Sequence, residues 1–411
     1  DEGDYYYFDL SFGVQGRDLL DNTRRKLLAV ADIEYNNRNF RGRAQRLQPR
    51  GLLALDMLQF SQLGYGLILQ DLDRREVATR FDVLTGLELV YSHPRFLKQT
   101  FGVQNLLLTI APYALLDLIG VTNNNLQREE FGARSELRKE LAELLERFFV
   151  TFGLEGKSVA TRDPEAGLFT PDGRRLFSPR RVVGKIYVDT SLDRRDSPLN
   201  PTKGFYLQLS PQLVNSDALN QQNISGALTN AFFRLSFSGS GYIPIGKSLV
   251  FGQSFRFGQI FPLSERRLPV PADERYVLGG VSSLRGFPES GINARVPSYR
   301  DLQRGGEFVM NTNTELRYPL LRRYGFYGAT FMDVGVLADC FDDENITEAA
   351  NCYTDAFPKE EPLRKVRASA GFGVRYLVAD QIPLLLDYAM LLNRKPGESF
   401  GYLHFNVGYT F

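Results

Sequence analysis

The chain has 411 residues, enough for two or three ordinary domains or for one large β domain. Its 49 basic and 48 acidic residues leave a formal net charge of +1, so bulk charge gives no reason to expect a nucleic-acid partner. No apolar run reaches the roughly 20 residues that a membrane-spanning helix requires, which excludes transmembrane helices. A membrane β-barrel is not excluded, because only alternate residues of its strands face lipid.

The two cysteines, Cys340 and Cys352, lie close together in one acidic segment. Their proximity favours one short-range disulfide formed in an oxidising compartment, with two free thiols as the alternative. The run Asp339–Glu344 lacks the ligand spacing of an EF-hand, which favours a solvated loop over a calcium site, and we predict no metal or cofactor. The chain starts at Asp1 without a signal peptide, so we expect a mature or trimmed chain whose upstream domains are missing.

The amino-terminal half of the chain alternates in polarity in several places. In Tyr7–Val14 the side chains of Phe8, Leu10 and Phe12 share one face, and Leu27–Tyr35 repeats this period of two, which is typical of strands. Less regular strands are expected at four further places: Arg43–Gln70, Thr79–Tyr91, Phe101–Leu116 and Phe149–Val159.

Two segments of this half interrupt the alternation. Asn36–Asn39 predicts a turn. In Glu136–Phe149 the apolar residues recur at helical spacing with charges between them, and Ser135 precedes them as a candidate cap. We therefore predict a short helix at Glu136–Phe149.

The carboxyl-terminal half alternates more regularly. Nine strands are expected, at Val182–Val188, Phe205–Ser210, Phe233–Gly239, Leu249–Phe257, Phe308–Tyr318, Phe326–Val336, Val366–Tyr376, Ile382–Met390 and Tyr402–Phe411. Many run about ten residues, the length that a tilted membrane-spanning strand needs. Their polar faces carry full charges, and no second hydrophobic layer is present to cover their apolar faces. Lipid would cover those faces, and a strand edge left open in lipid is costly, so a closed antiparallel transmembrane barrel is predicted.

A long turn-rich segment, residues 262–305, separates two of these strands. Its core, Val277–Phe287, combines Gly279, Gly280 and Gly286 with two serines and Arg285. Glycine permits positive φ and close backbone packing, and arginine seeks a carboxylate or phosphate. The pattern predicts a loop that folds back onto a polar surface, with a solvated surface loop as the alternative.

The stretch Leu284-Arg285-Gly286-Phe287, preceded by Leu278-Gly279-Gly280, resembles the loop signature of the BamA/TamA superfamily of outer-membrane assembly factors, the bacterial surface antigen family. Segments on both sides are similar to that family's flanking strands: Asp189–Gly204, Glu315–Pro319, Phe331–Gly335, Arg367–Gly373, Leu386–Tyr388 and the terminal Phe411. The resemblance is specific from about residue 182 to residue 411 and rests on pattern alone before that.

The resemblance implies a sixteen-stranded barrel in one domain, residues 1–411, preceded by periplasmic POTRA domains that this chain lacks. It implies that the loop enters the lumen and that Arg285 meets Asp333, beside Phe331 and Gly335. Glu315 and Arg317 are expected as second partners. The alternative for Asp333 is an ordinary hydrated charge of the lumen.

The resemblance further implies a bacterial outer-membrane protein without enzymatic activity, an organelle homologue being less favoured. Its partners would be membrane lipid, unfolded outer-membrane or secreted client proteins, and accessory subunits. We expect clients to insert at a weak lateral seam between the first and last strands. The seam residues are Phe8, Leu10, Phe12 and Gly13 in the first strand and Phe405, Val407, Gly408, Tyr409 and Phe411 in the last. A two-partner-type secretion pore and a passive porin are the alternative functions.

Overall fold

The computed structural model describes most of the chain. The description omits residues 1–5, 18–25, 43, 57–82, 97–105, 119–126, 143–144, 163–179, 199, 219–229, 247, 264–269, 293, 295–304, 340–355, 360–362, 379–381, 397 and 408–411. Cys340, Cys352, Gly408, Tyr409 and Phe411 therefore lie outside the described residues, and the predictions about them stay predictions.

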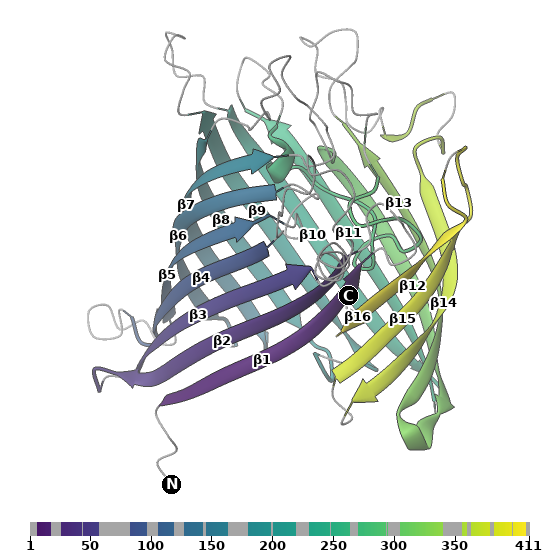
Figure 1. Cartoon of the computed structure of the whole chain (residues 1–411), viewed down its shortest axis with the longest axis horizontal. Helices are drawn as coiled ribbons and strands as arrows, with labels where there is room; N and C mark the ends of the chain where they lie inside the picture. Colours follow the sequence, from purple (N-terminus) through teal and green to yellow (C-terminus); the bar gives the residue numbers. More distant parts are fainter. Residues whose placement is uncertain are drawn as a thin grey trace, which may run out of the picture.

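The described residues form one antiparallel sheet in which each strand pairs with its neighbours in sequence (Figure 1). The sixteen strands described are β1 (Tyr6–Arg17), β2 (Lys26–Phe40), β3 (Gln45–Asp56), β4 (Val83–His93), β5 (Leu106–Asp117), β6 (Gln127–Glu140), β7 (Phe148–Arg162), β8 (Arg181–Asp193), β9 (Gly204–Ala218), β10 (Asn230–Ile245), β11 (Leu249–Pro262), β12 (Phe308–Leu321), β13 (Phe326–Ala338), β14 (Arg367–Val378), β15 (Ile382–Leu391) and β16 (Gly401–Val407). The sheet curls so that its two ends, β1 and β16, approach one another (Figure 1). The predicted all-β barrel of sixteen strands is confirmed.

The predicted helix at Glu136–Phe149 is wrong. Its first part belongs to β6, whose register runs from Gln127 opposite Arg162 to Glu140 opposite Phe149. Between β6 and β7 the Leu145 N–H donates to the Leu141 carbonyl at 3.1 Å. The helical spacing arose because Leu137, near the end of β6, is followed by the apolar residues of the turn. With β6 counted, the described sheet has sixteen strands.

The predicted turn at Asn36–Asn39 is also wrong, because these residues lie inside β2. The Asn36 side chain is fully buried and donates to the Tyr7 hydroxyl at 2.7 Å. Asn36 is therefore a polar residue of the inner face of the barrel and not part of a turn. The chain reverses after the strand instead, where Arg41, Gly42 and Ala44 all have positive φ.

The two faces of the sheet differ as the alternation predicts. On β1, Phe8 and Phe12 are 66% and 76% exposed on the outside. Charged residues on the inner face, such as Glu315 and Arg375, are fully buried. No helix in the described part of the chain is long and apolar enough to cross a membrane.

The segment between β11 and β12 folds into the barrel interior. It begins with the 3-10 helix η1 (Ala272–Glu274) and is tied together by the isolated bridges Tyr276–Gly306 and Leu278–Ile292. Leu278 and Leu284 are fully buried in a cluster with wall residues. That cluster comprises Val159, Val183, Val214, Phe232, Ile260, Val270, Tyr276, Leu278, Leu284, Phe287, Val309, Leu337 and Leu391. The loop is therefore a packed element of the lumen, as predicted.

Candidate functional site

The tip of the lumen loop closes on itself through backbone geometry that requires glycine. The Gly280 N–H donates to the carbonyls of Leu284 and Phe287 at 3.2 and 3.1 Å, and the Ser283 hydroxyl donates to the Gly279 carbonyl at 2.9 Å. Gly280 and Gly286 have φ values of +96° and +90°. Residues with a Cβ atom rarely adopt such positive φ values, whereas glycine does so readily. This tight tip leaves Arg285 projecting into the wall.

Arg285 forms the centre of a buried ion-pair cluster, which we call the arginine anchor. Its Nε and Nη2 donate to the two carboxylate oxygens of Asp333, both at 2.8 Å, and its Nη1 donates to Glu315 at 2.8 Å. Nη1 also reaches Asp387 at 3.4 Å. The guanidinium carbon lies 3.5 Å from the centre of the Phe331 ring. The planar fork of arginine matches this bidentate arrangement, which an ammonium group cannot reproduce.

The charges of the arginine anchor balance within the cluster. Arg375 pairs with Asp387 and donates to Glu315 at 3.0 Å, and Arg317 donates to Glu315 at 2.9 Å. Three carboxylates thus face three guanidinium groups. Burial alone would lower the pKa of Arg285, but the charges of Asp333, Glu315 and Asp387 raise that pKa above its ordinary value. Arg285 therefore stays charged although only 4% of its side chain is exposed.

Backbone contacts extend this anchor to the last strands of the sheet. The Ser369 hydroxyl on β14 donates to the Arg285 carbonyl. On β16, Nε2 of His404 accepts a hydrogen bond from the Gly286 N–H at 3.1 Å, which requires that nitrogen to be unprotonated. Two consecutive loop residues therefore contact β12, β13, β14, β15 and β16.

The other end of the loop meets a basic sector of the wall, which we call the glutamate anchor. Glu274 of η1 lies 2.9 Å from Nζ of Lys185 on β8, 3.3 Å from Nζ of Lys157 on β7 and 3.8 Å from Arg234 on β10. Burial alone would raise the pKa of Glu274, but Lys185, Lys157 and Arg234 together lower it below its ordinary value. The neighbouring Asp273 pairs with Arg181.

Two residues that follow Glu274 complete this end of the loop. Arg275 pairs with Asp339 at 3.1 Å and with Glu307 at 3.5 Å. The Tyr276 hydroxyl donates to the Leu235 carbonyl at 2.8 Å. A Cβ at Gly258 would lie 2.5 Å from the Tyr276 ring, so the wall is shaped to admit it.

The sequence-predicted site residues take the following places. Arg285 directly contacts Asp333, Phe331 and Glu315. Arg317 donates to Glu315, which also accepts from Arg285, so the two guanidinium groups, which repel each other, share one carboxylate. Gly335 lies behind the loop, where a Cβ would come within 3.1 Å of Leu278.

Sequence reasoning missed Asp387, Arg375 and His404 at the arginine anchor, and at the glutamate anchor it missed Glu274 together with its partners Lys157, Lys185 and Arg234. For Asp387, Arg375 and His404 a signal was present, because alternation places each on the inner face of its strand. For Glu274 there was none, since its lysine partners lie on other strands. Among the described residues no cluster of His, Cys, Asp or Glu has the geometry of a metal site.

Of the seam residues, Phe8, Leu10 and Phe12 lie exposed on β1, and Phe405 is half-buried on β16. Gly13 pairs with Val30 of β2, and Val407 pairs with Leu384 of β15. Within the described residues, no ladder of paired residues joins β1 to β16. These strands are therefore the two free ends of the described sheet.

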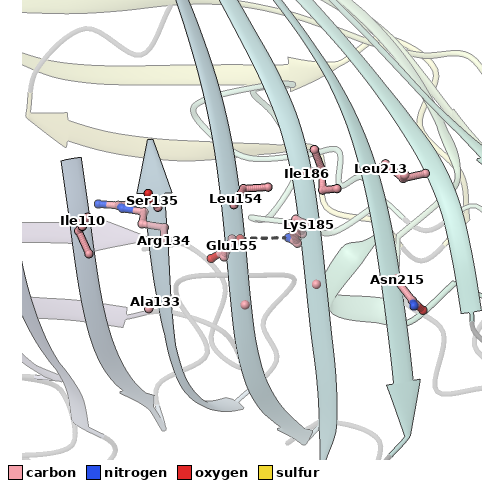
Figure 2. Close-up of a pocket in the computed structure, with 12 residues that line it drawn as sticks. Ile110, Ala133, Arg134, Ser135, Leu154, Glu155, Lys185, Ile186, Leu213 and Asn215 are labelled. Atoms are coloured by element: carbon pink, nitrogen blue, oxygen red, sulfur yellow. Dashed lines mark ion pairs between the residues drawn. The ribbon is translucent and has the colours of Figure 1, made fainter. Parts of the chain in front are cut away.

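The outer wall around the glutamate anchor carries a shallow hollow of about 540 Å³ across β5 to β9 (Figure 2). Leu154 and Ile186 on its rim are nearly half exposed, and a Cβ added at Gly156 or Gly184 would meet nothing within 4 Å. Lys185 pairs with Glu155 at 3.9 Å and also reaches Glu274, so it faces the interior. The wall is thus apolar outside and charged inside at the same height.

The barrel fold agrees with comparisons to known proteins. The family model for the Omp85 superfamily domain matches residues 121–411, more than half of the chain. The chain belongs to the Omp85 superfamily. It is 23% identical over 239 residues to the outer membrane protein assembly factor BamA of Neisseria meningitidis serogroup B, a match that covers 53% of this chain. The same match covers only 28% of that relative, so the chain corresponds to part of it.

Solved structures share the barrel fold with this Omp85 chain. The crystal structure of BamA from Haemophilus ducreyi lacking POTRA domains 1–3 superposes with a TM-score of 0.66 at 18% identity, covering 98% of this chain and 70% of that one. CdiB from Acinetobacter baumannii superposes with a TM-score of 0.52 at 9% identity, covering 98% and 60%. At these identities the likeness establishes the fold alone.

Proposed function

We propose that this chain is the barrel of an outer-membrane protein assembly factor that admits client strands at the β1–β16 seam. The proposal rests on two observations: the match to the Omp85 family model, and the absence of a ladder between β1 and β16 within the described residues. In this proposal the barrel lies in a bacterial outer membrane, and its partners are unfolded outer-membrane proteins, lipid and accessory subunits.

The seam suits this role because a free strand edge presents unpaired backbone groups. An incoming strand can satisfy those groups by β-augmentation, without any side-chain chemistry. The exposed faces of Phe8 and Phe12 border the seam and suit contact with lipid or with a client strand.

A passive porin fits less well, because the lumen loop is packed rather than loose. Leu278, Leu284 and Phe287 are buried against the wall, and Arg285 holds three carboxylates from three strands. An open diffusion pore needs a water-filled lumen, and this loop occupies the lumen across several strands.

A disulfide across the seam tests the proposal. In a background with Cys340→Ser and Cys352→Ser, a cysteine is placed in turn at Phe8, Leu10 and Phe12 and paired with one at Phe405. The purified chain is reconstituted in liposomes, and insertion of an unfolded outer-membrane β-barrel protein is followed by protease protection. We expect oxidation to lower insertion to the level of empty liposomes and reduction to restore it.

The matched control locks a ladder that is already paired. Leu10→Cys with Ile33→Cys joins register partners on β1 and β2, so oxidation there leaves the seam free and should leave insertion unchanged. Full insertion with a completely oxidised seam pair would refute the seam. Large steady conductance would point to a porin, and release of a secreted client across the membrane would point to a secretion pore.

A further inference from the structure

One guanidinium of the lumen has no partner among the described residues. Arg256 lies on β11, where its register partners are Ser238 on β10 and Asn311 on β12. The groups that influence it electrostatically are the cation Arg234 and the phenol of Tyr276, and no carboxylate is among them. Every other lumen arginine described above is paired with at least one carboxylate. Arg256 is half-buried. A charge partly withdrawn from bulk water without a counter-ion is unfavourable, which makes Arg256 an exception among these arginines.

Arg256 borders a pocket between the loop tip and the wall. The pocket encloses about 160 Å³, and its lining residues are Tyr206, Ser238, Gly239, Ser240, Ser254, Phe255, Arg256, Val281, Ser282, Arg285, Asn311 and Asn313. None of the twelve is acidic. A pocket of this size has room for several water molecules or for one small anion.

The pocket is supplied with hydrogen-bond donors. The Ser240 hydroxyl is buried there without a partner among the described residues. Ser238 lies directly opposite Arg256 across the strand pair, and Ser282 faces the pocket from the loop. Arg285 also borders the pocket, but its charge is already balanced by Asp333, Glu315 and Asp387. The free positive charge is therefore that of Arg256.

We propose that this pocket binds a small oxyanion of the phosphate type, held by the Arg256 guanidinium and the hydroxyls of Ser238, Ser240 and Ser282. A guanidinium fork and hydroxyl donors are the groups that recognise tetrahedral oxyanions. The bound anion would contact the wall through β10 and β11 and the loop through Ser282. It would therefore add a third attachment of the loop, between the glutamate anchor and the arginine anchor. This inference does not depend on the proposed client insertion.

Thermal unfolding of the purified chain in detergent micelles tests the site, with inorganic phosphate replacing chloride at constant ionic strength. A ligand that binds only the folded state raises the unfolding temperature in a saturable manner. We expect such a rise for the unmodified chain and none for Arg256→Gln. In chloride alone Arg256→Gln should unfold at the same or a higher temperature, because the substitution removes an unpaired charge.

Further variants separate the site from general effects of charge. Arg323→Gln removes an exposed arginine from the turn between β12 and β13 and should keep the full phosphate response. Arg256→Lys retains the charge without the fork, and Ser240→Ala removes one donor. By isothermal titration calorimetry each should weaken phosphate binding several-fold, and Arg256→Gln at least about tenfold. Acetate in place of phosphate tests whether a carboxylate suffices.

The proposal fails if the unmodified chain shows no saturable response to phosphate. It also fails if Arg256→Gln responds as the unmodified chain does. Should Arg256→Gln not fold, Arg256→Lys and Ser240→Ala decide by the same criterion, because Arg256→Lys keeps the charge and Ser240→Ala removes only one hydroxyl. Client insertion is not among these readouts, so failure of the seam proposal and failure of this one are distinguishable.

Discussion

The two anchors of the lumen loop use opposite charges and different chemistry. At the arginine anchor one guanidinium meets Asp333, Glu315 and Asp387, whose side chains are 0–1% exposed. At the glutamate anchor one carboxylate meets Lys157, Lys185 and Arg234, whose side chains are 6%, 13% and 21% exposed. The first anchor is drier and is held by bidentate geometry, whereas the second has flexible stems and more access to water.

This difference indicates unequal roles. A dry, bidentate cluster has one geometry and is costly to break, because each partner left behind is a buried unpaired charge. Lysine ammonium groups can reorient and hydrate when their partner leaves. We therefore expect the arginine anchor to fix the position of the loop and the glutamate anchor to hold its other end more loosely.

The largest effect is expected from Asp333→Ala. It removes both bidentate bonds and leaves Arg285 buried, which should cost about 3–5 kcal/mol of the free energy of unfolding. Denaturant titration of the purified chain measures this. Glu146→Ala is the control, since Glu146 forms a surface pair with Arg194 and its side chain is 81% exposed, so the change should be small. Equal effects of the two variants would contradict the ranking.

Glu274→Ala should cost less, about 1.5–3 kcal/mol, the range for hydrogen bonds to charged groups. The remaining lysines can hydrate, so the loop should become accessible to protease near η1 while the arginine anchor persists. Limited proteolysis with mass spectrometry locates the cut. Cleavage equally near Arg285 would show that the anchors release together and would remove the distinction drawn above.

Gly286→Ala tests the backbone beside Arg285. The φ of +90° and a distance of 3.0 Å from the new Cβ to Ser369 Cβ should together cost roughly 1–3 kcal/mol. Gly184→Ala is the matched control, because a Cβ there meets nothing within 4 Å. If both variants unfold alike, the loop backbone is less constrained than its contacts indicate.

His404→Leu should have a smaller effect on stability, about 1 kcal/mol, because it leaves only the Gly286 N–H without an acceptor. Its informative readout is the seam, since His404 lies on β16. Cross-linking between β1 and β16 should change in rate, whereas His404→Gln, which keeps an acceptor, should behave as the unmodified chain. An unchanged cross-linking rate in His404→Leu would show that the contact between the loop and β16 does not influence the seam.

Mild acid should leave the glutamate anchor intact. The pKa of Glu274 is lowered in the folded chain, so its contribution is present above the ordinary glutamate pKa of about 4.3 and is lost only as pH falls through the lower folded value. Protease sensitivity near η1 should therefore stay constant from about pH 7 to pH 4. A rise in sensitivity within that window would show that the lysines do not hold Glu274 as described.

Much of the fold follows from local pattern. Period-two alternation places Phe8 outside and Asn311 inside without reference to any other strand, because successive side chains of a strand point to opposite faces. The sequence analysis missed one strand, β6. Its last apolar residue, Leu137, lies at helical spacing from the apolar residues of the following turn, which suggested a helix. Local spacing cannot distinguish a strand followed by a turn from a short helix, whereas the pairing of β6 with β5 and β7 does.

The sequence by itself determined the barrel class, the inward faces of the strands and the glycine-framed loop that carries Arg285. It also indicated Asp333 and Glu315 as partners, through the family resemblance. Only the tertiary structure decided that Glu274 lies against Lys157 and Lys185 and that His404 on β16 accepts from Gly286. It also decided that Arg256 has no carboxylate partner among the described residues. The physical reason is that strand register and the path of a long loop are set by packing across the whole closed sheet, whereas alternation is a property of each strand alone.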